Sequence, residues 1–148
     1  MEKGLIYVIS VAVVIIAVLS LGILSLSSSP QVIQPPNPSQ YLGGHWSLYS
    51  SYVTNQGVQG LEKEYYYRFV DSNSDWLIYI KMIFKSSTYA RDYVNSLGFS
   101  GNLTLYTSIE GFNENVVLIQ GNTVTEVIYV GTTSQVPIGS LIGIAYLG

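Results

Sequence analysis

The chain begins with a long apolar run. Residues 5–26 form 22 consecutive positions without a charged side chain, and Ile, Val, Leu and Ala dominate them. A helix of this length reaches roughly 33 Å, enough to cross a hydrocarbon core of about 30 Å. The pattern predicts a transmembrane helix preceded by a short N-terminus, residues 1–4. A cleaved signal peptide is the alternative, although its apolar core of about 7–15 residues would be shorter.

The charges beside this run predict its orientation. Lys3 precedes the run, whereas the first Lys or Arg after it is Lys63. The positive-inside bias therefore places the N-terminus in the cytoplasm and the rest of the chain outside the cell membrane. We expect a single-pass protein whose partner is the lipid bilayer, contacted through residues 5–26.

Residues 27–40 separate the apolar run from the rest of the chain. They hold four of the five prolines and no charge. Proline-rich segments favour the extended polyproline II conformation, at about 3.1 Å per residue. The segment is predicted to be a spacer, and residues 41–148 are predicted to be one extracytoplasmic domain.

Within this domain, apolar positions recur at the spacing of strands. The clearest run begins at Trp76 and ends at Phe84, and its alternate residues from Trp76 to Phe84 form one core face. Gly121 and Asn122 give a two-residue hairpin signal between the last two strands. Strands are predicted at 45–54, 61–70, 76–84, 103–109, 115–120 and 123–130.

Two segments have helical spacing. Ser86 or Ser87 is placed to cap a helix that ends at Gly98, with apolar positions at Ala90, Tyr93, Val94 and Leu97. Residues 136–147 form a second predicted helix, with a closing edge strand as the alternative because Gly139 and Gly143 weaken a helix. The spacing of these two glycines favours close docking onto the sheet.

These elements predict an α+β fold. Strand 76–84 with its helix and strand 124–132 with its helix are offset by 48 residues, so a ββ(β)α unit is predicted to occur twice. The expected product is an antiparallel sheet with two helices packed on one face.

Composition narrows the function. Charged residues make up 10% of the chain, the net charge is −3, and there is no cysteine. Nucleic acid is therefore not an expected partner, and thiolate metal sites are excluded. The low charge, with 13 Tyr, behind an N-terminal anchor resembles surface proteins of thermoacidophilic archaea, and the resemblance implies an acidic exterior.

Candidate catalytic groups are few. His45 is the only histidine, and a nucleophilic triad would need a base of this kind beside a nucleophile and an orienting group. Glu62 and Glu64 lie about 7 Å apart on one strand face, a separation also found between acid/base pairs. The solvated face of a strand explains them better, so no enzyme activity, catalytic residue or cofactor is predicted.

Two further motifs are weak candidates for sites. Asp71, Asn73 and Asp75 reproduce the opening of a calcium loop, but Trp76 and Met82 stand where the loop needs Gly and Glu. A polar turn is the preferred interpretation. Asn102 begins an Asn-Leu-Thr sequon, which makes it a glycosylation candidate on an extracytoplasmic domain.

Two functional classes remain. The first is a membrane-anchored binding or accessory module, a small subunit of a cell-envelope complex with an envelope protein as its partner. The second is a filament subunit, because Lys3 and Gly4 directly before the apolar run resemble the processing site of archaeal type IV pilin-like precursors. That resemblance implies cleavage after Gly4.

Overall fold

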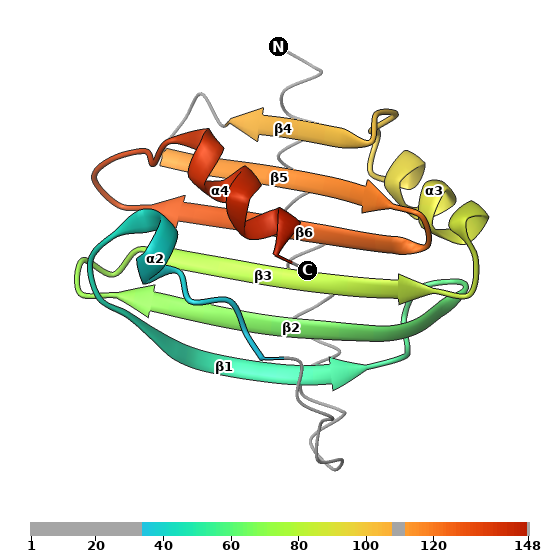
Figure 1. Ribbon diagram of the computed structural model, residues 1–148, viewed down its shortest axis with the longest axis horizontal. Helices are drawn as coiled ribbons and strands as arrows, with labels where there is room; N and C mark the ends of the chain where they lie inside the picture. The colour runs from blue at the N-terminus through green and yellow to red at the C-terminus, as the bar shows by residue number, and fades with distance from the viewer. Residues whose placement is uncertain (1–33, 108–111, 148) are drawn as a thin grey trace.

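A computed structural model describes residues 34–107 and 112–147. They form a six-stranded antiparallel sheet with three helices, which confirms the predicted α+β class (Figure 1). The strands lie in the order β1-β2-β3-β6-β5-β4. Their bounds are β1 (Trp46–Thr54), β2 (Leu61–Asp71), β3 (Trp76–Phe84), β4 (Leu103–Thr107), β5 (Phe112–Gln120) and β6 (Thr123–Gly131). The helices are α2 (Ser39–Leu42), α3 (Ser87–Ser96) and α4 (Ile138–Tyr146).

The two central strands, β3 and β6, are apolar on both faces. Ile80 and Met82 of β3 belong to one buried cluster, whereas Leu77 and Tyr79 belong to another. Successive side chains of a strand point to opposite faces. Each face of the sheet therefore needs its own cover.

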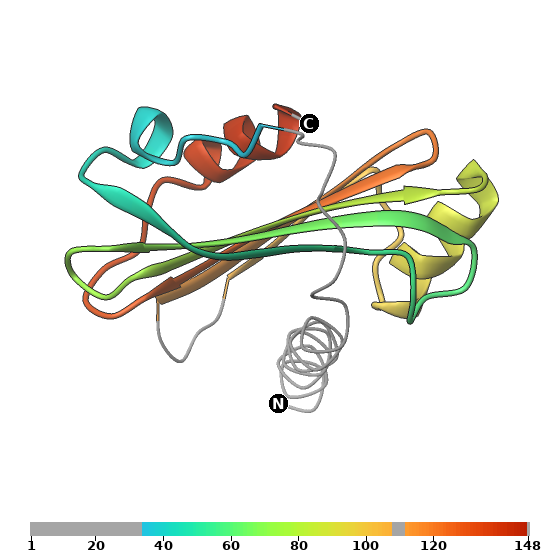
Figure 2. The ribbon, with the colours of Figure 1, turned by 90° about the horizontal axis from the view of Figure 1, so that it is seen from below.

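The helices provide this cover from opposite sides, which corrects the prediction that two helices pack on one face. Ala90 and Val94 of α3 pack in the cluster of Ile80, whereas Leu141 and Ile144 of α4 pack in the cluster of Leu77. Figure 2 shows α2 and α4 above the sheet and α3 below it. We call these two sides the α4 face and the α3 face.

Local signals set the ends of α3 as predicted. The Ser86 Oγ accepts a hydrogen bond from the Tyr89 backbone N–H at 3.4 Å, and so caps the helix. Beyond the last turn, Gly98 has a φ of 86°, in the left-handed region that glycine tolerates best.

The segment before β1 folds onto α4. Helix α2 begins at Ser39, so the predicted spacer ends earlier than Gln40. A Cβ added at Gly143 would lie 3.0 Å from the Tyr41 ring. Gly143 therefore allows α2 to approach α4, whereas a Cβ at Gly139 would have no neighbour within 4 Å, so the predicted docking of the two glycines onto the sheet was wrong. The alternative of an edge strand at 136–147 was wrong.

The predicted repeat is present in the strands and broken in the helices. β1-β2-β3-α3 and β4-β5-β6-α4 follow the same order, and β3 pairs with β6 at the centre. The two-fold axis that relates antiparallel β3 to β6 is perpendicular to the sheet, so an exact repeat would have both helices on one face. The observed helices lie on opposite faces, as covering two apolar faces requires.

The predicted membrane anchor at residues 5–26 and the first half of the spacer, residues 27–33, lie outside the described residues. Within residues 34–107 and 112–147, no helix has the length and apolar character to cross a bilayer.

Truncation of Phe84 to Ala tests the α3 face as a core. Phe84 is fully buried and its ring lies 5.6 Å from that of Tyr93. We expect the variant to lose about 3–5 kcal/mol of unfolding free energy, because it leaves a cavity. Denaturant titration measures the loss. Leu48→Ala, at an exposed position, is the matched control, and an equal loss there would contradict this assignment of the core.

Candidate functional site

Two glutamates are buried on the α3 face. Glu64 of β2 is 3% exposed and Glu126 of β6 is 2% exposed. The Tyr52 hydroxyl donates a hydrogen bond to Glu64 Oε1 at 3.1 Å, and the Tyr93 hydroxyl donates one to Glu126 Oε1 at 2.6 Å. The prediction of a solvated Glu64 was therefore wrong. Glu62, its predicted neighbour on that face, is exposed.

The pattern of β2 explains this error. Tyrosines occupy both faces of the strand, so its alternation does not distinguish the buried side chains from the solvated ones. Tyr52, which satisfies the Glu64 carboxyl, comes from β1, a separate strand. Only the register of β1 against β2 brings the two side chains together.

Burial changes the acidity of both carboxyls. Desolvation raises the pKa of Glu64 to about 7; the hydrogen bond from Tyr52 opposes this shift and the charge of Glu126 adds to it. Burial likewise raises the pKa of Glu126, opposed by the hydrogen bond from Tyr93. Both groups therefore favour the protonated, neutral form far more than an exposed glutamate does.

Within residues 34–107 and 112–147, three polar atoms on the same face are buried without a hydrogen-bond partner: Tyr66 Oη, Arg68 Nε and Asn115 Oδ1. Buried polar groups in folded proteins are nearly always paired, so a group of unpaired ones needs an explanation. The pKa of Tyr66 is raised by burial, lowered by Arg68 and raised by Glu64, which shows that these groups interact electrostatically.

The strand register relates the three atoms to one another. Arg68 lies opposite Ile78 of β3, and Asn115 lies opposite Ile128 of β6. Because Ile78 and Ile128 are also paired, these four residues form one row across the sheet. Arg68 and Asn115 are three strand spacings apart, about 14 Å. The row is therefore an apolar floor of two isoleucines between two polar ends.

Aromatic rings surround Arg68. Its guanidinium carbon lies 3.6 Å from the centre of the Trp76 ring and 5.2 Å from that of Tyr49. Tyr49 sits where the pairing of β1 with β2 shifts register, between Leu48 and Ser50. A bulge of this kind re-aims a side chain, and here the Tyr49 ring packs edge-on against Trp76 at 5.1 Å.

Helix α3 leaves part of this face without a helix of the described chain. Its 10 residues span about 15 Å, whereas the nine residues of β3 extend about 30 Å. Figure 2 shows α3 at one end of the sheet. We call the part beyond it, with Tyr66, Arg68, Trp76 and Asn115, the open site; Tyr66 and Asn115 are themselves buried there, and Arg68 and Trp76 are half-buried.

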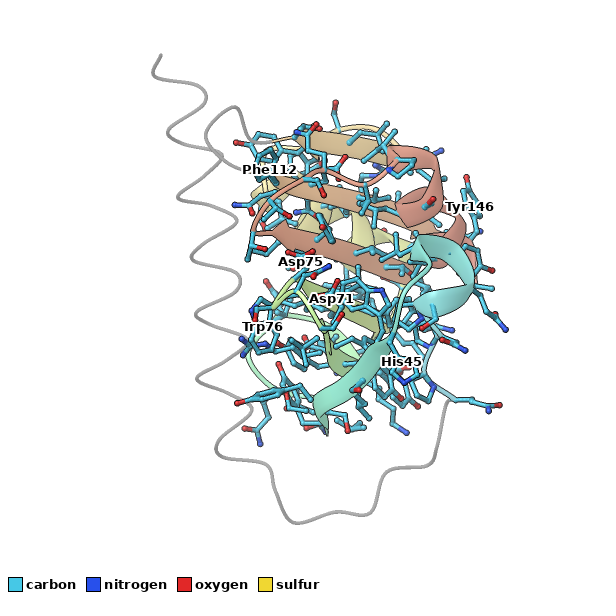
Figure 3. All side chains as sticks on the ribbon, turned by 90° about the vertical axis from the view of Figure 1, so that its left-hand side faces the viewer. His45, Asp71, Asp75, Trp76, Phe112 and Tyr146 are labelled. Atoms are coloured by element: carbon cyan, nitrogen blue, oxygen red, sulfur yellow. The ribbon has the colours of Figure 1, made fainter. Side chains whose placement is uncertain are left out.

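The predicted calcium-loop residues form a hydrogen-bonded turn. Asp71 Oδ1 accepts hydrogen bonds from the backbone N–H groups of Asn73 and Asp75 at 2.8 and 2.9 Å. Asp75 is buried; its Oδ1 accepts from the Thr132 N–H and hydroxyl at 2.7 Å, and its Oδ2 from the Tyr129 hydroxyl at 3.2 Å. These carboxylates tie the β2–β3 turn to the segment after β6, at the end of the sheet seen in Figure 3.

The other predicted candidates lie apart from the open site. Asn102 is exposed before β4, and its Oδ1 accepts a hydrogen bond from Arg91 at 2.5 Å. His45 is exposed just before β1. In the parts of the chain that the structure describes, no three His, Asp or Glu side chains are grouped as metal ligands would be.

Sequence reasoning missed Glu126, Tyr93 and Asn115 as site residues. Glu126 carried a usable signal, because it is a single charge within a strand of otherwise uncharged residues. Such a residue is either at an edge or buried with a partner. Asn115 carried no such signal, since a polar residue near the start of a strand is ordinary.

The two buried glutamates predict that stability rises in acid. Between about pH 4.5 and 7 the folded state binds more protons than the unfolded state, because the pKa of Glu64 is raised to about 7 on folding. The unfolding free energy should therefore be highest below the ordinary glutamate pKa and fall as the pH rises through this window, by about 3 kcal/mol for Glu64. Denaturant titrations of the full chain at several pH values measure the slope.

Matched variants assign that slope to the buried groups. Glu64→Gln keeps the shape but does not titrate, so its stability should change much less between pH 4.5 and 7. Glu62→Gln, at the exposed position on the same strand, should retain the wild-type slope. Stability that increases with pH in the wild-type chain would contradict the assignment.

Comparison with known proteins assigns no family to this chain. No protein-family model, curated protein or solved structure matches the chain. The functional argument therefore depends on the residues of the open site and on the sequence before residue 34.

Proposed function

We propose that this chain is a membrane-anchored extracytoplasmic binding module, and that its ligand binds at the open site. The anchor is the charge-free run at residues 5–26. The observation that carries the binding role is the group of three unpaired buried polar atoms, Tyr66 Oη, Arg68 Nε and Asn115 Oδ1. A ligand that pairs with them would recover the desolvation cost of each, about 1–3 kcal/mol.

The chemistry of these atoms favours a neutral carbohydrate. Arg68 Nε needs an acceptor, Asn115 Oδ1 needs a donor, and the Tyr66 hydroxyl accepts either. Sugar hydroxyls are both donors and acceptors. Ile78 and Ile128 lie between these atoms but are buried, so the half-buried Trp76 ring beside Arg68 is the aromatic surface offered to the C–H face of a sugar ring.

We propose a structural role rather than a catalytic one for the two glutamates. Each carboxyl already accepts a hydrogen bond from a tyrosine hydroxyl, whereas the three polar atoms of the open site have no hydrogen-bond partner among the described residues. A general acid or base needs to reach the proton it transfers. The Glu64 hydrogen bond joins β1 to β2, and the Glu126 hydrogen bond joins α3 to β6.

Trp76 fluorescence tests the binding role. Trp46→Phe leaves Trp76 as the single tryptophan of the chain, and the probes are maltotriose, cellotriose and mannotriose. We expect a saturable change in Trp76 emission with at least one of them. Asn115→Leu should weaken that binding about tenfold, equivalent to about 1.4 kcal/mol.

Asn115→Leu should also stabilise the fold, although it weakens ligand binding, because the Asn115 amide oxygen is buried without a hydrogen-bond partner. Replacing a buried unpaired amide with an apolar side chain should raise the unfolding free energy by about 1 kcal/mol. Asn113→Ala, at an exposed position on the same strand, is the control and should change neither property. Loss of stability in Asn115→Leu, or no response of Trp76 to any probe, would contradict the proposal.

Protease treatment of intact cells tests the topology. Cleavage before Pro38, which is buried at the start of α2, should release a folded fragment and leave the anchor with the cells. Immunoblotting with tags at both ends measures the two products. Full protection in intact cells, with cleavage only after lysis, would place the domain on the cytoplasmic side.

The pilin-like alternative stays a prediction. Its motif, Lys3 followed by Gly4, lies outside the described residues. Determination of the mature N-terminus distinguishes the anchored binding module from a pilin-like subunit, because a processed filament subunit would begin at Leu5.

A further inference from the structure

Within the described residues the sheet has two edge strands, and neither carries a charged side chain or a proline, although β1 has a bulge after Leu48 and β4 has only five residues. β1 and β4 are the outermost strands. Neither contains Lys, Arg, Asp, Glu or Pro, the residues with which natural proteins block exposed edges. Leu48 of β1 and Leu103 and Leu105 of β4 are also exposed, by 48, 37 and 47%.

The directions of the strands make these two edges complementary. Every neighbouring pair is antiparallel and the sheet has six strands, so β1 and β4 run in opposite directions (Figure 1). A second copy placed beside the first in the same orientation brings its β1 next to β4 of the first. The two strands are then antiparallel, and the sheet continues across the boundary.

The exposed leucines match in the same arrangement. Leu103 and Leu105 lie opposite Leu118 and Val116 and therefore point to the α4 face. Leu48 lies opposite Phe69, which belongs to the same face. Copies in the same orientation keep their α4 faces on one side, so Leu48 of one copy lies on the face that bears the leucines of the next.

The backbone of β4 has donors and acceptors directed outward. The Ile119 N–H donates to the Asn102 carbonyl at 2.8 Å, so Asn102 bonds to β5. Hydrogen-bonding positions alternate along an antiparallel strand. The N–H and C=O groups of Leu103, Leu105 and Thr107 therefore face away from β5, toward the free edge.

We propose that copies of this chain assemble head to tail, with β4 of one copy paired to β1 of the next in a continuous antiparallel sheet. A contact between two different surfaces leaves one free edge at each end, so the assembly grows as a row. Neighbouring copies are rotated relative to one another by the twist of the sheet, and their α4 faces stay on one side of it. The contact is independent of the open site.

Edge-blocking variants of the full chain in detergent micelles test this arrangement. Leu103→Lys with Leu105→Lys blocks β4, and Leu48→Lys with Ser51→Lys blocks β1. Light scattering gives the protein mass. We expect oligomers of the wild-type chain that grow with concentration, monomers of each blocked variant alone, and heterodimers when the two are mixed.

Controls separate loss of the edge from loss of the fold. Thr88→Lys with Asn95→Lys adds the same charge to exposed positions of α3 and should assemble as the wild type does. If circular dichroism shows that the β4 lysine variant is unfolded, Thr107→Pro serves as the β4-blocking variant instead. This substitution removes only one outward N–H of β4. A monomeric wild-type chain at all concentrations would overturn the proposal. A β1-blocked variant that dimerises alone would also overturn it, because it would show β4 paired with β4.

Discussion

The hydrogen bond between the Tyr93 hydroxyl and Glu126 fixes the arrangement of the α3 face. Glu126 stands in a central strand with apolar neighbours, where a carboxyl is costly unless it is hydrogen-bonded and neutral. Tyr93 of α3 supplies the donor at 2.6 Å. The bond therefore sets where the helix lies on the sheet, and α3 is too short to extend over the rest of that face.

The part of the α3 face beyond α3 is the open site. Arg68 and Asn115 lie beyond α3, at the two ends of the row that crosses the central strands, and Trp76 stands beside Arg68. Their unpaired groups and the raised pKa of Glu64 have one origin, which is burial of polar side chains on a sheet that is apolar on both faces. An acidic exterior suits this arrangement, because protonated carboxyls cost less to bury than charged ones.

Much of the fold was predictable because local signals decide it. The bounds of β3 coincide with its apolar run, and Ser86 caps α3 as its position indicated. The face on which each helix packs was not predictable, since β3 offers apolar side chains to both sides and the alternation is equally satisfied by either. The Glu64 environment was not predictable either, because Tyr52 reaches it from another strand through the register of β1 and β2.

The measurement that tests this account most directly is the pKa of Glu64 itself. Carbon-13 labelling of glutamate side chains allows each carboxyl to be followed by NMR as the pH changes, and Glu64→Gln assigns the resonance. The account predicts a midpoint near pH 7 for Glu64. A Glu64 carboxyl that titrates near its ordinary value of about 4.3 would show that it is solvated, and would contradict the packing proposed for the whole α3 face.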